Sequence, residues 1–187
     1  MKIRLAAYLQ PDSIVDGEGI RTVIWTQGCP HNCEGCHNPE THDFNGGALV
    51  ELEEVFDIID TLEGQTGITF SGGDPFMQSK QCSKIAKYAI DKGYNIWCYT
   101  GFTFEQLLKL SETKKEIMEF LKTIDILVDG KFEIDKKSLD NIFAGSSNQR
   151  IIDVKKSLEQ NQIILVEKYK KKHKISALEH SKEYMYI

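Results

Sequence analysis

The chain has 187 residues, a formal net charge of −5 and five cysteines. This length fits one domain, and no apolar run approaches the roughly 20 residues that span a bilayer. The first residues lack the long apolar stretch and cleavage site of a secretory signal, so we expect a cytoplasmic protein that does not bind membranes. The acidic balance also makes nucleic acid a poor partner.

Short runs of β-branched and aromatic residues predict five strands. They lie at Ile20–Thr26, Gly67–Phe70, Tyr94–Tyr99, Ile124–Val128 and Ile163–Val166. Helical periodicity fills three of the intervals between them. These helices are expected at Leu49–Leu62, at Ser79–Lys92 with Gly93 as a stop signal, and at Phe104–Lys122 behind the capping pair Thr103 and Gln106. The alternation of strand and helix predicts an α/β fold with a parallel sheet and right-handed crossovers.

The chain is too short for a complete eight-unit barrel, which takes about 250 residues. If the sheet curls, we expect an incomplete, open (β/α) barrel. We assign residues 1–166 to this domain and residues 167–187 to a charged C-terminal extension, either helical or mobile. The basic run 168–174 is interpreted as a solvated face, with an acidic partner or electron donor as the alternative contact.

Four loops with chemically useful residues follow the first four predicted strands. They contain Cys29, then Ser71-Gly72-Gly73-Asp74-Pro75, then Thr100-Gly101, then Asp129-Gly130-Lys131. Because the carboxyl ends of parallel strands share one edge of a sheet, we expect these loops to form a single site.

Three of the cysteines, Cys29, Cys33 and Cys36, have C-x3-C-x2-C spacing. Three soft thiolates suit zinc or iron–sulfur, and in a four-iron cluster they leave one iron open to a reacting ligand. The alternative is a structural zinc site that uses His31, His37 or His42 as its fourth ligand. The chain has no second Cys-x2-Cys pair, which favours iron–sulfur. Cys82 and Cys98 fall in regular structure and are interpreted as buried thiols.

The cysteine spacing together with the Gly72-Gly73-Asp74-Pro75 loop resembles the radical S-adenosylmethionine (SAM) superfamily. Within it, the chain is similar to the activating proteins of anaerobic ribonucleoside-triphosphate reductases, and Gly35 before the third cysteine agrees with this group. The closer resemblance covers nearly all of the chain up to Arg150. It is carried by Asp16–Thr22, His37–Thr41, Trp97–Gly101, Leu127–Phe132 and Gly145–Arg150.

The resemblance implies a [4Fe-4S] cluster on Cys29, Cys33 and Cys36, with SAM bound to the open iron. One electron from a low-potential donor such as flavodoxin would cleave SAM to a 5′-deoxyadenosyl radical. This radical would remove a hydrogen from a glycine of the reductase large subunit and leave a glycyl radical there. The implied SAM contacts are Gly35, Cys36, His37, Gly72, Gly73, Asp74, Asp129 and Lys131.

Asp16 and Arg21 belong to the segment that resembles the peptide-binding part of related activators. Several alternatives remain open at this point. Asp129 and Lys131 fit a solvated turn equally well, Asp16 and Arg21 fit a glycine-rich turn, and Trp97 or Tyr99 could flank a nucleoside or pack in the core. The competing functions are activation of another glycyl radical enzyme such as pyruvate formate-lyase, a base-modifying synthase, and a non-catalytic zinc-binding module.

Overall fold

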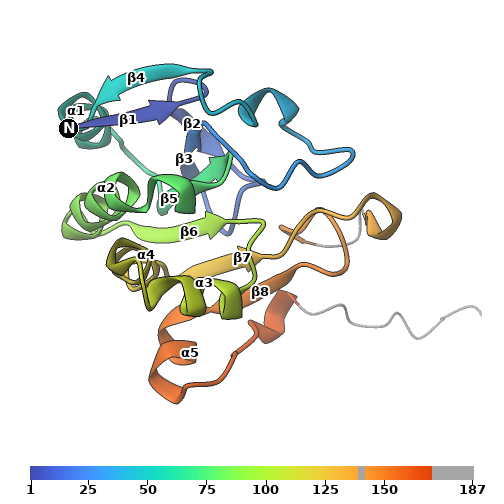
Figure 1. Cartoon of the computed structure of the whole chain (residues 1–187). Helices are drawn as coiled ribbons and strands as arrows, with labels where there is room; N and C mark the ends of the chain where they lie inside the picture. Colours follow the sequence, from blue (N-terminus) through green and yellow to red (C-terminus); the bar gives the residue numbers. More distant parts are fainter. Residues whose placement is uncertain (139–141, 170–187) are drawn as a thin grey trace, which may run out of the picture.

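The fold was analysed in a computed structural model, which describes residues 1–138 and 142–169. One mixed sheet forms its centre (Figure 1). The strands are β1 (Lys2–Leu5), β2 (Gln10–Ser13), β3 (Arg21–Thr26), β4 (Ala48–Glu51), β5 (Gly67–Gly72), β6 (Asn95–Tyr99), β7 (Ile126–Asp129) and β8 (Arg150–Asp153). Their order is β4-β1-β3-β5-β6-β7-β8, with β2 paired to β3 beside this path.

The centre of the sheet is parallel and its margins are antiparallel. Strands β3, β5, β6 and β7 run in the same direction, which confirms the predicted parallel core. Strands β1, β2 and β4 on one side and β8 on the other pair antiparallel. The sequence analysis missed these marginal strands because they are only four residues long and β2 consists largely of polar residues.

The last predicted strand is wrong. In the Ile163–Val166 segment only Leu165 forms a β-bridge, with Ile152, while the sheet is completed by β8. The predicted Leu49–Leu62 helix is also shorter than expected, because its first residues pair with β1 as strand β4.

The helices are α1 (Leu52–Asp60), α2 (Ser79–Asp91), α3 (Phe104–Ser111), α4 (Lys115–Leu121) and α5 (Val154–Gln160). The single helix predicted over Phe104–Lys122 is therefore two helices. The predicted cap is confirmed, since the Thr103 backbone N–H donates to Gln106 Oε1 at 2.9 Å and Thr103 Oγ1 accepts from the Gln106 N–H at 3.3 Å. This reciprocal pair satisfies two N–H groups that the first turn of α3 leaves without helical partners.

The two faces of the sheet are covered differently. Helices α1 to α4 pack on one face, where alternate strand residues such as Phe70 and Cys98 join the main hydrophobic core (Figure 1). On the other face Trp97 and Val128 form a smaller cluster with Phe143 and other partly buried side chains. The carboxyl ends of the parallel strands open beside this second face.

The end of the described chain returns to the sheet. Residues Glu167–Tyr169 form a short 3₁₀ helix, η4, in which Lys168 pairs with Glu18 and the Tyr169 hydroxyl donates to Glu18 Oε2 at 2.8 Å. The remainder of the predicted extension, 170–187, lies outside the described residues, as does most of the basic run. Over 1–138 and 142–169, no helix is long and apolar enough to cross a membrane.

Candidate functional site

A cavity of about 280 Å³ lies where the four parallel strands end. Each of the four loops expected to meet there contributes to its wall. The lining residues are Asp16, Trp25, Cys29, His31, Cys33, Cys36, His37, Asn38, His42, Ser71, Gly72, Gly73, Tyr99, Thr100, Gly101, Gly130, Phe132, Gly145 and Gln149. The topology thus brings distant segments to one site, as parallel strands predict.

Three thiols share this cavity. Cys29, Cys33 and Cys36 all line it, and all are free of disulfides. The loop that carries them takes left-handed backbone conformations at Asn32 (φ 46°) and Gly35 (φ 69°). At Gly35 a β-carbon would lie 2.8 Å from Cδ1 of the Ile134 side chain, so the turn between the last two cysteines favours glycine.

Backbone N–H groups reach the sulfur atoms. The Asn38 N–H donates to Cys36 Sγ at 3.4 Å. The backbone N–H of His31 lowers the pKa of Cys29, and that of Phe132 lowers the pKa of Cys33. Such N–H donors stabilise negative charge on sulfur, which is the charge state in which cysteine binds metals.

Burial nevertheless keeps the first two thiols protonated in the absence of metal. It raises the pKa of Cys29 to about 11, with further increases from Asp74 and the neighbouring thiols. Burial also raises the pKa of Cys33, while the nearby charge of Lys131 lowers it. Metal binding must therefore release protons from this cavity.

Three thiols suit an iron–sulfur cluster that keeps one iron open to a further ligand. A structural zinc site uses four donors. Here three soft donors open onto one cavity, and backbone N–H groups near thiolates are the environment that an iron–sulfur cluster uses.

The histidines near the cysteines occupy different environments. His31 Nε2 lies 2.7 Å from Asp74 Oδ2, and this pairing occupies one ring nitrogen. The ring of His37 packs on Phe132 at 4.9 Å. His42 lines the cavity, and its Nε2 is buried with no hydrogen-bond partner in the described part of the chain. A buried polar atom of this kind calls for a partner inside the cavity.

The Gly72-Gly73 loop lies against the start of the cysteine loop. A β-carbon at Gly72 would lie 2.6 Å from the Thr26 carbonyl oxygen, and one at Gly73 would lie 2.5 Å from that of Gly28. Gly72 has a φ of 95° and both glycines line the cavity. Close packing of two loops therefore explains both glycines, in addition to the access to a ligand expected from the sequence.

Four of the predicted SAM contacts, Gly35, Asp74, Asp129 and Lys131, are outside the set that lines the cavity, whereas Cys36, His37, Gly72 and Gly73 belong to it. The buried Asp129 carboxylate accepts from the Phe104 N–H at 2.7 Å and pairs with Arg150 at 2.5 Å. Its observed contacts are thus within the protein.

The two residues predicted to bind a partner peptide are linked through Thr69, whose hydroxyl donates to the Asp16 carbonyl at 2.7 Å and accepts from Arg21 Nε. Asp16 lines the cavity, and its carboxylate accepts from the Ser13 hydroxyl at 2.5 Å. Arg21 is fully buried at the opposite end of β3, where its guanidinium donates to Thr69 Oγ1 at 2.6 Å and to Asn95 Oδ1 at 2.8 Å. The guanidinium of Arg21 thus lies behind the segment that contains Asp16, and its role toward a partner peptide stays a prediction.

Sequence reasoning missed Trp25 among the residues that line the cavity. Trp25 on β3 pairs with Ser71 on β5, which belongs to a predicted site loop, and the two project to the same side of the sheet. Period-two alternation along β3 could have found Trp25. Tyr99 also lines the cavity, whereas Trp97 packs against Phe143 at 5.3 Å.

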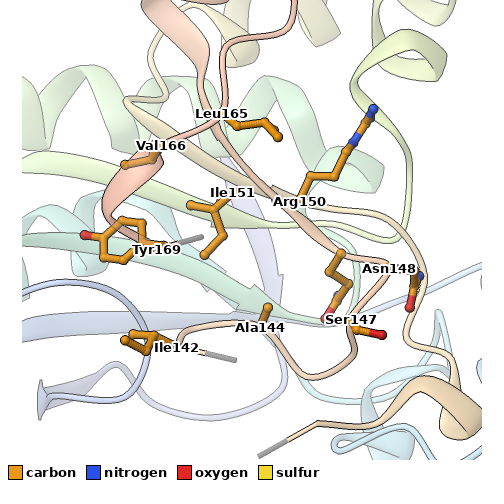
Figure 2. Close-up of a pocket in the computed structure, with 10 residues that line it drawn as sticks. Ile142, Ala144, Ser147, Asn148, Arg150, Ile151, Leu165, Val166 and Tyr169 are labelled. Atoms are coloured by element: carbon orange, nitrogen blue, oxygen red, sulfur yellow. The ribbon is translucent and has the colours of Figure 1, made fainter. Parts of the chain in front are cut away.

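A second pocket of about 340 Å³ lies at the edge strand β8 (Figure 2). Figure 2 shows Ile151, Leu165, Val166 and Tyr169 along its wall, so it is largely apolar. Gln149 lines both this pocket and the cysteine cavity, and only the 145–150 segment separates the two.

Comparisons with known proteins agree with this chemistry. Residues 15–152 match the family described as a 4Fe-4S single cluster domain. The anaerobic ribonucleoside-triphosphate reductase-activating protein of Haemophilus influenzae is 33% identical over 77% of this chain and 96% of its own length. The protein of that name from Escherichia coli is 36% identical over 74% and 92%, and that from phage T4 is 31% identical over 76% and 90%.

One solved structure is more distantly similar. QueE from Escherichia coli superposes with a TM-score of 0.46 and 14% identity, covering 55% of this chain and 54% of that chain.

Proposed function

We propose that this chain, which belongs to the family of anaerobic ribonucleoside-triphosphate reductase-activating proteins, installs a glycyl radical on the large subunit of such a reductase. It is a radical SAM enzyme whose cofactors are a [4Fe-4S] cluster and SAM. One observation carries the proposal. The three thiols of the C-x3-C-x2-C motif open onto the same cavity as the Gly72-Gly73 loop.

Within this function, Cys29, Cys33 and Cys36 would hold the cluster and leave one iron for SAM. When bound, the cluster and SAM supply a 5′-deoxyadenosyl radical that removes a hydrogen atom from the glycine of the reductase. The chain supplies position and seclusion. Backbone N–H groups stabilise the thiolates, and Trp25 and Tyr99 give the cavity an apolar wall that limits access of water to a radical.

Contacts to SAM are proposed at two levels. Cys36, His37, Gly72 and Gly73 would touch it directly, since they line the cavity. Gly35, Asp74, Asp129 and Lys131 would act from behind this wall by shaping its loops. The sheet would correspond to the open (β/α) barrel of this superfamily, formed by residues 1–166 with a separate extension at 167–187.

The glycine segment of the reductase would enter through a groove of about 390 Å³ beside the cavity. This groove shares Asp16, His37, Tyr99 and Gly145 with the cavity. Apolar side chains form its outer rim, where Ile14 is 70%, Val15 71% and Ile142 56% exposed. An exposed apolar rim around a polar base fits an extended peptide whose side chains pack outside while its glycine reaches the cavity.

The reducing electron would come from a low-potential carrier such as flavodoxin. The test of the function begins with anaerobic reconstitution of the protein with iron and sulfide, followed by dithionite and SAM. We expect 5′-deoxyadenosine in the products, and its absence would refute the radical mechanism. A zinc-loaded sample prepared in the same way is the control, because zinc has no redox chemistry.

The partner is tested separately. The reconstituted protein is mixed with the large subunit of the anaerobic reductase, and the glycyl radical doublet is sought by electron paramagnetic resonance. A pyruvate formate-lyase serves as the comparison substrate. A doublet on the lyase and none on the reductase would assign the chain to another glycyl radical enzyme.

A further inference from the structure

The side chain of His31 is held inside the protein although it lies between two cysteines of the motif. It is 7% exposed, and its Nε2 lies 2.7 Å from Asp74 Oδ2. Its ring meets the edge of Phe102 at a centroid distance of 4.5 Å. A β-carbon at Gly101 would lie 2.3 Å from the ring, so the loop after β6 has a glycine where the imidazole sits.

Asp74 is the centre of this contact. The fully buried carboxylate also accepts from the Phe76 N–H at 3.0 Å, the Thr100 hydroxyl at 2.8 Å and the Gly101 N–H at 3.0 Å. Each of these groups donates to the Asp74 carboxylate, and His31 Nε2 lies where it can donate to the same carboxylate. This carboxylate therefore joins the loops after β3, β5 and β6.

The backbone of His31 forms the middle of the turn between two of the proposed ligands. His31 follows Cys29 by two residues and precedes Cys33 by two. The Asp74 N–H in turn donates to the carbonyl of Gly28, the residue before Cys29, at 2.9 Å. Asp74 thus contacts the Cys29–Cys33 turn at two points, through Gly28 just before Cys29 and through His31 in the middle of the turn.

We propose, on the basis of the proposed function, that His31 is a positioning residue. Through Asp74 it fixes the turn between Cys29 and Cys33 against the Gly72-Gly73 loop, and so sets the reduction potential of the cluster and its coupling to SAM. Hydrogen bonds to cluster sulfurs stabilise the reduced cluster, which has the greater negative charge, and so raise the reduction potential. Release of the turn would let the backbone between Cys29 and Cys33 move away from the cluster sulfurs, and loss of such hydrogen bonds moves the potential to more negative values.

The test replaces His31 in anaerobically reconstituted protein. His31→Leu removes the donor and keeps apolar volume beside Phe102. We expect the iron and sulfide content to stay near that of the wild type. The equilibrium constant for one-electron reduction of the cluster should fall about tenfold, which corresponds to a reduction potential about 59 mV more negative. The paramagnetic signal of the reduced cluster should respond to SAM only at about tenfold higher concentration, as expected for loss of one charge-assisted hydrogen bond.

Two variants separate the hydrogen bond from packing. His31→Gln places an amide N–H where Nε2 lies and should restore most of the potential and the SAM response. Phe102→Leu removes the ring contact and keeps the hydrogen bond, so its potential should equal that of the wild type. A wild-type potential and SAM response in His31→Leu would overturn the proposal, as would an equal shift in Phe102→Leu.

If His31→Leu does not retain a cluster, the comparison moves to His31→Gln and His31→Asn. The shorter asparagine does not reach Asp74. A wild-type reduction potential in His31→Asn would therefore refute the positioning role. A potential that is shifted in His31→Asn but not in His31→Gln would support it. Failure of the proposed function is recognised differently. A wild-type protein that forms no 5′-deoxyadenosine would contradict that function, while the potentials would still decide the role of His31.

Discussion

The two faces of the sheet use the same strands for different purposes. On β6, Ile96 and Cys98 point into the core beneath the helices, whereas Trp97 and Tyr99 point to the opposite side, where the cavity opens. The helix face is almost entirely apolar. The site face combines aromatic rings with the polar groups of Ser71 and Arg21.

This difference shows why burial alone does not identify function here. Both faces contain cysteines with raised pKa values, because burial raises the pKa of Cys82 as well as that of Cys29. Only Cys29, Cys33 and Cys36 share a cavity, and Cys36 Sγ there accepts from the backbone N–H of Asn38. Shared surroundings, and not burial, distinguish a metal-binding thiol from a core thiol.

The largest expected effect compares one cysteine from each face. Cys33→Ser should lose most of the brown cluster absorbance and all SAM cleavage. In the proposed site the cluster is held by only three thiolates, so loss of one leaves a second iron without a protein ligand. Iron content, visible absorbance and 5′-deoxyadenosine yield measure this. Full activity in Cys33→Ser would reject the ligand assignment.

Cys82→Ser is the matched control from the helix face. Cys82 is fully buried in α2, so the new hydroxyl would be buried among apolar side chains. We expect a retained cluster and a loss of about 1–3 kcal/mol in the free energy of unfolding. Loss of the cluster in this variant would show that the two faces are not independent.

A deletion in the core beneath the helices should affect stability without affecting chemistry. Phe120 on α4 is fully buried and packs against Phe70 at 5.2 Å and Phe76 at 5.0 Å. Phe120→Ala should lower the free energy of unfolding by about 3–5 kcal/mol, since a cavity remains where the ring was. Denaturant melts give this value, and SAM cleavage per folded molecule at low temperature should stay near that of the wild type.

Substitution of Arg21 tests whether the part of the site face at the start of β3 contributes to stability and not to activity. Its buried guanidinium has no carboxylate partner among the described residues and donates to Thr69, Asn95 and backbone carbonyls. Arg21→Met should cost about 1.5–3 kcal/mol, because charged hydrogen bonds are lost and buried acceptors remain unpaired.

The yield of glycyl radical per folded molecule should not change in Arg21→Met. A selective loss of that yield, with stability intact, would restore Arg21 to the peptide-binding site predicted from the sequence. Asp16→Asn provides the comparison, because Asp16 lines both the cavity and the groove.

The sequence predicted helices, strands and caps better than it predicted which side chains contact one another. The parallel strands and the Thr103 cap depend on nearby residues, so periodicity and capping patterns were sufficient to find them. Strand β8 escaped prediction because its place depends on pairing with β7, which no local pattern records.

The same limit applies to the site. The spacing of the three cysteines predicts a metal site, and Asp74 and Asp129 were expected to face the ligand. Their carboxylates contact residues brought close only by the fold, His31 for Asp74 and Arg150 for Asp129, which the sequence could not predict. From the sequence alone, a carboxylate at a strand end that faces a ligand cannot be told from one that faces the protein interior.

The smallest expected effect concerns the border of the site face, where Arg150 joins Asp129 to Glu105. Arg150 donates to Glu105 Oε1 at 3.0 Å and to Oε2 at 2.8 Å. The hydrogen bond from Arg150 lowers the pKa of Glu105 from 4.5 to about 2. The Glu105 side chain is 57% exposed, so solvent screening limits its contribution, and Glu105→Gln should cost below about 1 kcal/mol at neutral pH.

The pH dependence has a defined sign. Because the folded-state pKa of Glu105 is below its unfolded value of 4.5, the stabilisation is complete above that pH and disappears as pH falls toward 2. The stability difference between wild type and Glu105→Gln should therefore shrink over this window. Glu116→Gln, in the corresponding first turn of α4, is the control for removal of a carboxylate that has no ion pair among the described residues. If the stability difference between wild type and Glu105→Gln persists at pH 2, Glu105 acts through packing. The stabilising ion pair of Arg150 would then be the one with Asp129 alone.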